Sequence, residues 1–166
     1  MKHLAILVSL LLPACSPSGS EVLKRSGEPD VITVSSEDAA VNAAIEKARS
    51  TLSSFQKALE STPADAEGFA VKVGFRHSVG DGQEHIWLLE PSFSDGMVAG
   101  VVNNEPVNVT TLKLGQHVSV PVGEISDWMF VQGGVLHGGY TIRALLEKES
   151  PEERARCLAE WGFRLE

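Results

Sequence analysis

The sequence predicts one α+β domain, in which a long N-terminal amphipathic helix packs on a mainly antiparallel sheet of four to six strands and two short C-terminal helices follow. Three observations predict this class. Apolar residues recur at steps of three and four over residues 41–59, apolar and polar residues alternate in short runs over residues 69–131, and helical spacing returns after residue 140. Short turns between the alternating runs favour antiparallel pairing.

The long helix has a start signal, a stop signal and an apolar stripe. Ser35 and Ser36 precede Glu37 and Asp38, a pattern typical of an N-cap with acidic residues in the first turn. Pro63 sets the other end, because proline cannot continue a helix. The stripe that we expect to pack on the sheet consists of Val41, Ile45, Ala48, Leu52, Phe55 and Leu59.

Five apolar or alternating runs are predicted as strands, and they span residues 69–75, 84–90, 97–102, 118–122 and 125–131. Gly, Pro, Asn and Asp residues gather between them and favour turns. The connecting loops are expected to include residues 91–96 and 103–106, while residues 107–114 are undecided between strand and loop.

A loop with four glycines follows the fifth strand at residues 132–139, and two helices follow the loop. The first helix is expected at residues 140–148. Ser150 followed by Pro151 is a start signal for the second helix, and Gly162 is its expected stop.

Residues 1–14 have the features of a signal peptide, with Lys2 followed by an apolar run. The run is shorter than the ~20 residues that span a bilayer, so it is not an anchor. Residues 12–15 read Leu-Pro-Ala-Cys, which resembles the lipobox of bacterial lipoproteins. We therefore expect Cys15 to carry lipid and to attach the protein to the membrane. Plain secretion with cleavage near Ala14 is the alternative.

The rest of the chain divides into a tether at residues 15–30, rich in Ser, Gly and Pro, and one domain at residues 31–166. If Cys15 carries lipid, Cys157 is expected to be a small buried hydrophobic side chain; a disulfide between the two is the alternative. Ser16 follows the lipobox cysteine. By resemblance to Gram-negative lipoproteins, this residue implies an outer-membrane location, with the domain facing the periplasm.

Several kinds of chemistry are disfavoured. The formal net charge of −8 and the lack of basic runs argue against a nucleic-acid partner. The histidines stand apart, without His-x-His or Cys-x-x-Cys patterns, so we expect no metal and no cofactor. Ser126, Asp127 and His137 could form a triad on paper, but no Gly-x-Ser-x-Gly motif supports it.

The candidate ligand site lies around the glycine loop. Gly138 and Gly139 precede a helix, where backbone N–H groups would bind an anion with the help of Arg143, or would form a tight turn. Asp127 would accept hydrogen bonds from the loop backbone or pair with Arg143, while Trp128 packs on the long helix. Read as the walls of one pocket, the predicted ligand-binding residues are Asp127, Trp128, His137, Gly138, Gly139, Tyr140 and Arg143.

Five motifs follow one another at residues 84–87 (EHIW), 100–106 (GVVNNEP), 114–116 (LGQ), 125–130 (ISDWMF) and 138–143 (GGYTIR). Together they resemble the YegJ-like family of bacterial proteins, domain of unknown function 2314. The resemblance covers residues 31–148 and implies a small bacterial protein, with no activity or catalytic residues to carry over.

Three functions fit these observations. The first is a lipid-anchored envelope protein that binds another protein or a small ligand without catalysis. The second is a hydrolase or transferase acting on an envelope component, with Asp127 or His137 as general acid or base; it requires Asp127, His137 and Glu84 to converge in a pocket. The third, suggested by small size, acidity and location, is an immunity-like protein that neutralises a periplasmic toxin.

Overall fold

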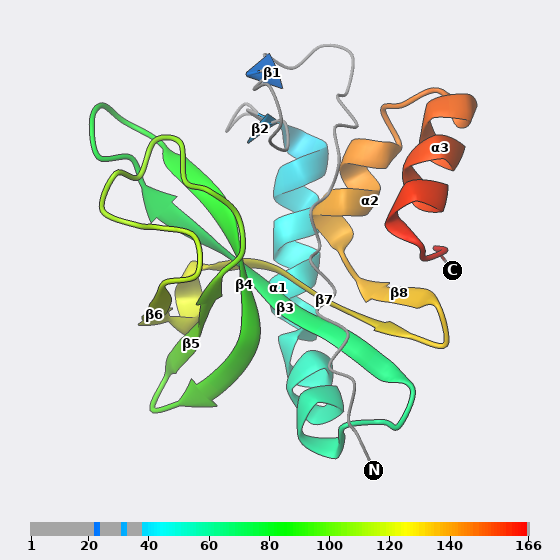
Figure 1. The fold of residues 1–166 in the computed structure, drawn as a ribbon, viewed down its shortest axis with the longest axis horizontal. Helices are drawn as coiled ribbons and strands as arrows, with labels where there is room; N and C mark the ends of the chain where they lie inside the picture. Colours follow the sequence, from blue (N-terminus) through cyan, green and yellow to red (C-terminus); the bar gives the residue numbers. More distant parts are fainter. Residues whose placement is uncertain (1–21, 24–30, 33–37, 166) are drawn as a thin grey trace.

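The structure, a computed structural model, describes residues 22–23, 31–32 and 38–165. A six-stranded antiparallel sheet, one long helix and two short C-terminal helices make up the fold (Figure 1), which confirms the predicted α+β class. In chain order the strands of this sheet are β3 (Ala66–Arg76), β4 (Gln83–Ser94), β5 (Met97–Val102), β6 (His117–Pro121), β7 (Ile125–Gln132) and β8 (Val135–Gly138).

Within the sheet the strands lie in the order β6, β5, β4, β3, β7, β8, and every neighbouring pair is antiparallel. A short 3-10 helix, η1 (Val122–Glu124), joins β6 to β7. Because β7 pairs with β3, the chain brings its fifth predicted strand back beside the first. Two further short strands, β1 (Val22–Leu23) and β2 (Val31–Ile32), pair with each other, and β1 falls in the segment predicted as a tether.

The long helix α1 spans Ala39–Ser61 and contacts β7. Its N-cap is Asp38, whose side chain accepts hydrogen bonds from the N–H groups of Ala40 and Val41. The helix thus begins after the two predicted serines, which lie outside the described residues. It ends before Pro63, as predicted.

Two core clusters lie on opposite faces of the sheet, because neighbouring residues of β3 and β7 alternate between them. The first cluster packs under α1. Phe55 of α1 is fully buried there, with its ring 5.4 to 6.4 Å from four other aromatic ring centroids. The buried members of the second cluster are Ala70, Trp87, Met129, Leu136, Ile142, Leu146, Cys157 and Phe163.

Two predicted loops are strands in the structure. Residues 91–96 were expected to be a loop, yet β4 continues through Pro91 to Ser94, because an irregularity between Leu89 and Ser92 accommodates the proline. The glycine loop holds β8, because Gly133 and Gly134 both take positive φ and close a two-residue hairpin turn. Residues 107–114 form no strand.

The C-terminal helices are α2 (Tyr140–Leu146), two residues shorter than expected, and α3 (Pro151–Trp161). Ser150 caps α3 by accepting a hydrogen bond from the N–H of Glu153, and Gly162 ends it at a φ of 75°, as predicted. Cys157 is fully buried, as expected. The predictions for residues 1–14 and for lipid on Cys15 lie outside the described residues.

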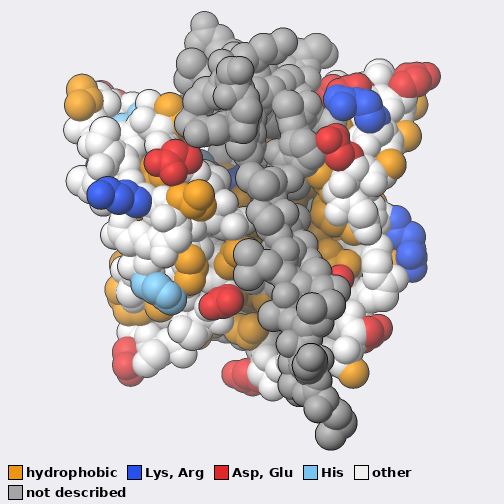
Figure 2. All heavy atoms as spheres, viewed as in Figure 1, with side chains coloured by type: hydrophobic (Ala, Val, Ile, Leu, Met, Phe, Trp, Pro, Cys, Tyr) orange, Lys and Arg blue, Asp and Glu red, His pale blue; other side chains and the backbone are white. Residues whose placement is uncertain are grey.

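On the face shown in Figure 2, the described Lys and Arg side chains lie apart from one another, and acidic side chains are spread between them. No helix within the described residues is long and apolar enough to cross a membrane.

Candidate functional site

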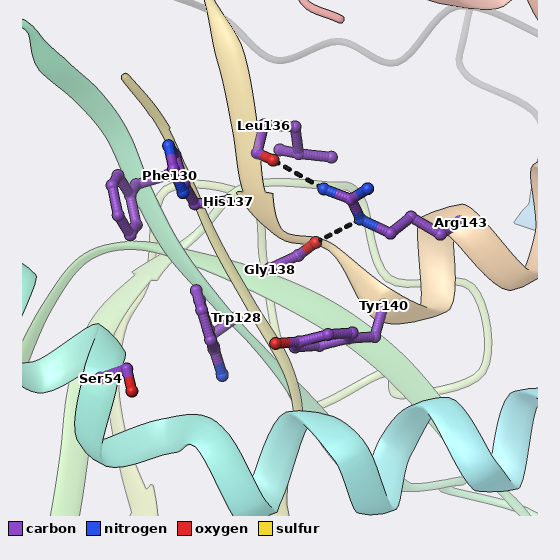
Figure 3. A pocket seen from close by; sticks show the side chains of 8 residues that line it. All are labelled: Ser54, Trp128, Phe130, Leu136, His137, Gly138, Tyr140 and Arg143. Atoms are coloured by element: carbon purple, nitrogen blue, oxygen red, sulfur yellow. Dashed lines mark hydrogen bonds between the residues drawn. The ribbon is translucent and has the colours of Figure 1, made fainter. Parts of the chain in front are cut away.

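An open pocket of about 460 Å³ lies where α1, β7, β8 and the start of α2 meet (Figure 3). Trp128 and Phe130 come from the same face of β7, and α1 supplies the exposed Ser54 at the rim. The full lining is Ser54, Trp128, Phe130, Leu136, His137, Gly138, Tyr140 and Arg143.

Four rings form the wall of this pocket. Trp128 is 4% exposed and is held to α1, because its indole N–H donates to the carbonyl of Ala48 at 2.9 Å. The ring of Tyr140 stands edge-on to it, with centroids 5.6 Å apart. Phe130 and His137 stack at 4.7 Å with planes 10° apart. These contacts fix the flat surfaces before any ligand arrives.

Arg143 supplies the positive charge of the pocket. Its Nε donates to the carbonyl of Gly138 at 2.9 Å, and its Nη2 donates to the carbonyl of Leu136 at 2.7 Å (Figure 3). Among the residues that the structure describes, no carboxylate pairs with it. A guanidinium has five N–H donors, so two of them fix the group in place and three remain for other acceptors.

Gly138 and Gly139 take the chain from β8 straight into α2, with φ values of 71° and 60°. A Cβ atom on Gly138 would collide with the carbonyl oxygen and the ring of Trp128. A Cβ atom on Gly139 would lie 2.7 Å from a side-chain carbon of Leu136. These glycines therefore form the tight turn of the sequence analysis, and they let the backbone run against the pocket wall.

Asp127 lies behind the pocket and is fully buried. Its carboxylate accepts hydrogen bonds from the backbone N–H groups of Trp128, Tyr140 and Thr141, at 2.8, 3.1 and 2.8 Å, and from the Thr141 hydroxyl at 2.6 Å. It thus caps α2 from a neighbouring strand. Of the two predicted roles, Asp127 accepts bonds from the backbone; within the described residues it does not pair with Arg143.

This arrangement also decides between the two predictions for the glycine turn. Asp127 already occupies the N–H groups of Tyr140 and Thr141, so these groups are not available to an external anion. Burial raises the pKa of Asp127, while the hydrogen bonds from Thr141 and the charge of Lys72 oppose that rise.

A polar network on the second face of the sheet was missed in the sequence analysis. Lys72 of β3 lies opposite Asp127 in the β3–β7 register, donates to the Thr141 hydroxyl at 3.3 Å and lies 5.5 Å from the centre of the Trp87 ring. Burial lowers the pKa of Lys72, and the charge of Asp127 opposes that fall. The only sequence signal was a lysine in the middle of a central strand.

His85 extends the same network. Its Nδ1 lies 2.8 Å from the hydroxyl of Ser126, and that hydroxyl donates to the carbonyl of Lys72. The pKa of His85 falls from 6.5 to about 4, first because of burial around the bonded ring and then because of the positive charges of Lys72 and Arg49. Its ring is therefore neutral near pH 7.

The remaining predicted chemistry is dispersed. Ser126 contacts His85, Asp127 caps α2 and His137 stacks on Phe130, so these three residues form no triad. Glu84 accepts hydrogen bonds from the N–H groups of the loop at residues 107–108. The described residues contain no group of three or more His, Cys, Asp or Glu side chains that could hold a metal ion.

Of the seven predicted ligand-binding residues, the structure brings Trp128, His137, Gly138, Tyr140 and Arg143 to the pocket lining. Asp127 and Gly139 support the lining from behind. Sequence reasoning did not find three other lining residues, Ser54, Phe130 and Leu136. Ser54 approaches from α1, far away in the sequence, and the other two carry apolar side chains that look like ordinary core.

Comparison with known proteins places this geometry in a family. Residues 38–165 match the family described as "Uncharacterized protein conserved in bacteria (DUF2314)", which confirms the resemblance found in the sequence. The chain is 33% identical over 162 residues to the uncharacterized protein YegJ of Escherichia coli K12, covering 95% of this chain and 99% of that protein.

A second relative is a putative ankyrin repeat protein of Neisseria meningitidis serogroup B, 39% identical over 143 residues. The match covers 82% of this chain but spans only 56% of that relative's length. No solved structure matches the chain.

Proposed function

This chain belongs to the DUF2314 family of uncharacterized bacterial proteins, and we propose that its domain is a non-catalytic binding module whose ligand site is the pocket between α1, β7, β8 and α2. The observation that carries the proposal is the state of Arg143. Two backbone carbonyls hold it beside an aromatic wall, and none of the described carboxylates pairs with it. Such a fixed donor among flat apolar surfaces is typical of a binding site.

The positions of the acid–base groups also support binding without catalysis. A hydrolase or transferase would need Asp127, His137 and Glu84 within hydrogen-bond reach of one substrate. Asp127 is buried under α2, Glu84 holds a distant loop, and His137 faces the pocket alone. The enzyme alternative therefore lacks the convergence that it requires. The immunity-like alternative rests on size, charge and predicted location, and no contact among the residues that the structure describes favours it.

The location of the protein is part of the proposal. Signal-peptide features at residues 1–14 and the lipobox at residues 12–15 support export and a lipid anchor on Cys15, at the outer membrane with the domain in the periplasm. Labelling cells with a palmitate analogue tests the anchor: label on the wild type and none on Cys15→Ala supports it, and equal labelling of both refutes it.

The proposed pocket can be tested through its tryptophan. The chain has three tryptophans, so 5-fluorotryptophan labelling gives three ¹⁹F signals, and only Trp128 lines the pocket. In a screen of small aromatic compounds, we expect binders to move the Trp128 signal. Ser54→Phe should block this response by filling the pocket from its exposed rim, and Ser53→Phe, on the exposed neighbour, should not.

Two outcomes would contradict the proposed function. One is a screen in which no compound moves the Trp128 signal, or in which Ser54→Phe responds like the wild type. The other is turnover of a hydrolase substrate by the purified protein that His137→Ala abolishes, since His137 is the one histidine lining the pocket.

A further inference from the structure

Resting on the proposed binding function, we propose that the pocket takes a flat apolar group that carries a carboxylate. The carboxylate would bind the guanidinium of Arg143, and the flat group would lie against the half-buried rings of His137 and Tyr140, beside Trp128. Figure 3 shows these parts in one view, with the guanidinium against β8 and the rings grouped below it and to one side.

Arg143 carries the first step. Its hydrogen bonds to Gly138 and Leu136, at 2.9 and 2.7 Å, orient the plane of the guanidinium and leave three N–H donors. A carboxylate matches a pair of parallel N–H groups in both spacing and charge, and such charge-assisted bonds are stronger than neutral ones. Because the guanidinium is already held, binding would cost little side-chain entropy.

The rings carry the second step. Phe130 is covered by two stacked rings, Phe69 at 4.9 Å and His137 at 4.7 Å. The ring surfaces open to a ligand are therefore those of the half-buried His137 and Tyr140, and Tyr140 stands at 84° to Trp128. Aromatic groups favour such stacked and edge-on contacts. Gly138 adds no side chain to the lining, which keeps the wall open beside Trp128.

The supply of donors favours a carboxylate over a phosphate. The N–H groups of Tyr140 and Thr141, which would otherwise face an anion at the start of α2, are taken by Asp127. Lys72 is likewise engaged with Thr141 on the other side of that carboxylate. Arg143 is thus the one cationic side chain in the lining, in a chain of net charge −8. One guanidinium matches one negative charge.

Two sources could present this chemistry, a free aromatic acid or the C-terminal aromatic residue of a peptide. The probes are therefore 2-naphthoate, its neutral amide 2-naphthamide, the tripeptide Ala-Ala-Trp, the same tripeptide as its C-terminal amide, and inorganic phosphate. Affinities are measured by the Trp128 ¹⁹F signal in fluorotryptophan-labelled protein. Tighter binding of Ala-Ala-Trp than of 2-naphthoate would identify the peptide source, and the reverse order would identify the free acid.

We expect each carboxylate to bind at least about tenfold more tightly than its amide, a difference of about 1.4 kcal/mol. Arg143→Gln should reduce this preference to within about twofold. Arg154→Gln is the matched control, because Arg154 also donates to a backbone carbonyl, that of Leu146, but lies outside the pocket lining. It should leave the preference unchanged.

If Arg143→Gln does not fold, the wild type still tests the inference through salt. Raising NaCl from about 0.05 to about 0.5 M should weaken the binding of the carboxylates several-fold and leave the binding of the amides unchanged. Amides that bind as tightly as carboxylates, or phosphate that competes as well as 2-naphthoate, would overturn the carboxylate inference while leaving the binding function intact. If none of the probes binds, the inference fails, and an unresponsive Trp128 throughout the aromatic screen removes the proposed function as well.

Discussion

Asp127 is the residue on which the geometry of the candidate site depends. It is fully buried in β7, and its carboxylate accepts four hydrogen bonds, three of them from the first two residues of α2. Because α2 carries Tyr140 and Arg143, the position of this helix sets the position of both pocket residues. Asp127 is therefore a positioning residue: it acts on the ligand site through α2 and does not line the pocket.

Replacing this carboxylate should destabilise the fold. In Asp127→Asn the ammonium group of Lys72 would lose the opposite charge beside it. The N–H groups of the introduced side-chain amide would also meet the N–H and O–H donors of Thr141, which need an acceptor. We expect the free energy of unfolding to fall by about 3 kcal/mol in urea titrations. The double variant with Lys72→Met should lose at least about 1 kcal/mol less than the sum of the single variants. Additive losses would show that the two charges are not coupled.

His85 gives the fold a predictable response to acid. Its folded-state pKa of about 4 is below its ordinary value of 6.5. Between pH 6.5 and pH 4 the ring therefore binds a proton in the unfolded chain but not in the folded chain. Stability should therefore fall as the pH drops from 6.5 towards 4. We expect the free energy of unfolding to fall by on the order of 1 kcal/mol. This is less than the pKa shift alone implies, because the residue is exposed and water screens its charge.

Two measurements check this response. His85→Asn should lose less stability than the wild type when the pH falls from 6.5 to 4. At pH 7.5 the ring is neutral in both the folded and the unfolded wild type, so its titration does not contribute to the stability difference between the two proteins. In the wild type, the proton NMR signals of the His85 ring should not titrate above about pH 5. A midpoint near 6.5 would contradict the account of this residue.

At the scale of elements, the site depends on how β8 turns into α2. The turn is made at Gly138 and Gly139, both in the left-handed region, and it brings the backbone against Trp128. Any side chain at Gly138 faces two penalties, the conformational cost of positive φ and the overlap with Trp128.

Comparing Gly138→Ala with Gly80→Ala separates these two penalties. Gly80 has a similar φ of 79°, but nothing lies within 4 Å of the position of its Cβ. We expect Gly80→Ala to cost about 1 kcal/mol and Gly138→Ala about 3 kcal/mol or more in thermal or urea unfolding. Gly138→Ala should also shift the fluorescence of Trp128. Equal costs for the two variants would show that the Trp128 contact does not constrain the turn.

The sequence predicted the elements that have strong local signals. The α1 stripe, the alternating strands and the Ser150 cap of α3 all appeared where expected. It failed where a local signal has two readings. Gly133 and Gly134 close a hairpin, although glycines also mark loops, and Pro91 continues a strand because an irregularity accommodates it.

The candidate site was predictable in part because most of its residues lie in one short segment. A cluster of aromatic, glycine and arginine residues was therefore visible in the sequence. The contribution of Ser54 and the pairing of Lys72 with the Asp127 network depend on strand register and helix placement across the sheet. No pattern in a single sequence states those long-range contacts.

At the scale of the whole molecule, the sheet separates two kinds of environment. Its first face holds the aromatic core under α1, and the pocket opens where that core meets β8 and α2. Its second face holds the Lys72–His85 network beside the cluster covered by α2 and α3. The polar network lies apart from the pocket lining.

The most direct test of this account is a map of where an aromatic carboxylate binds. In ¹H–¹⁵N NMR spectra of the protein titrated with 2-naphthoate, the largest shifts should fall on the indole N–H of Trp128, the backbone N–H of His137 and the Nε–H of Arg143. Signals of Lys72, His85 and Trp87 should move least. Shifts concentrated on those three residues, or no shifts at the pocket, would contradict the claim that this pocket is the ligand site.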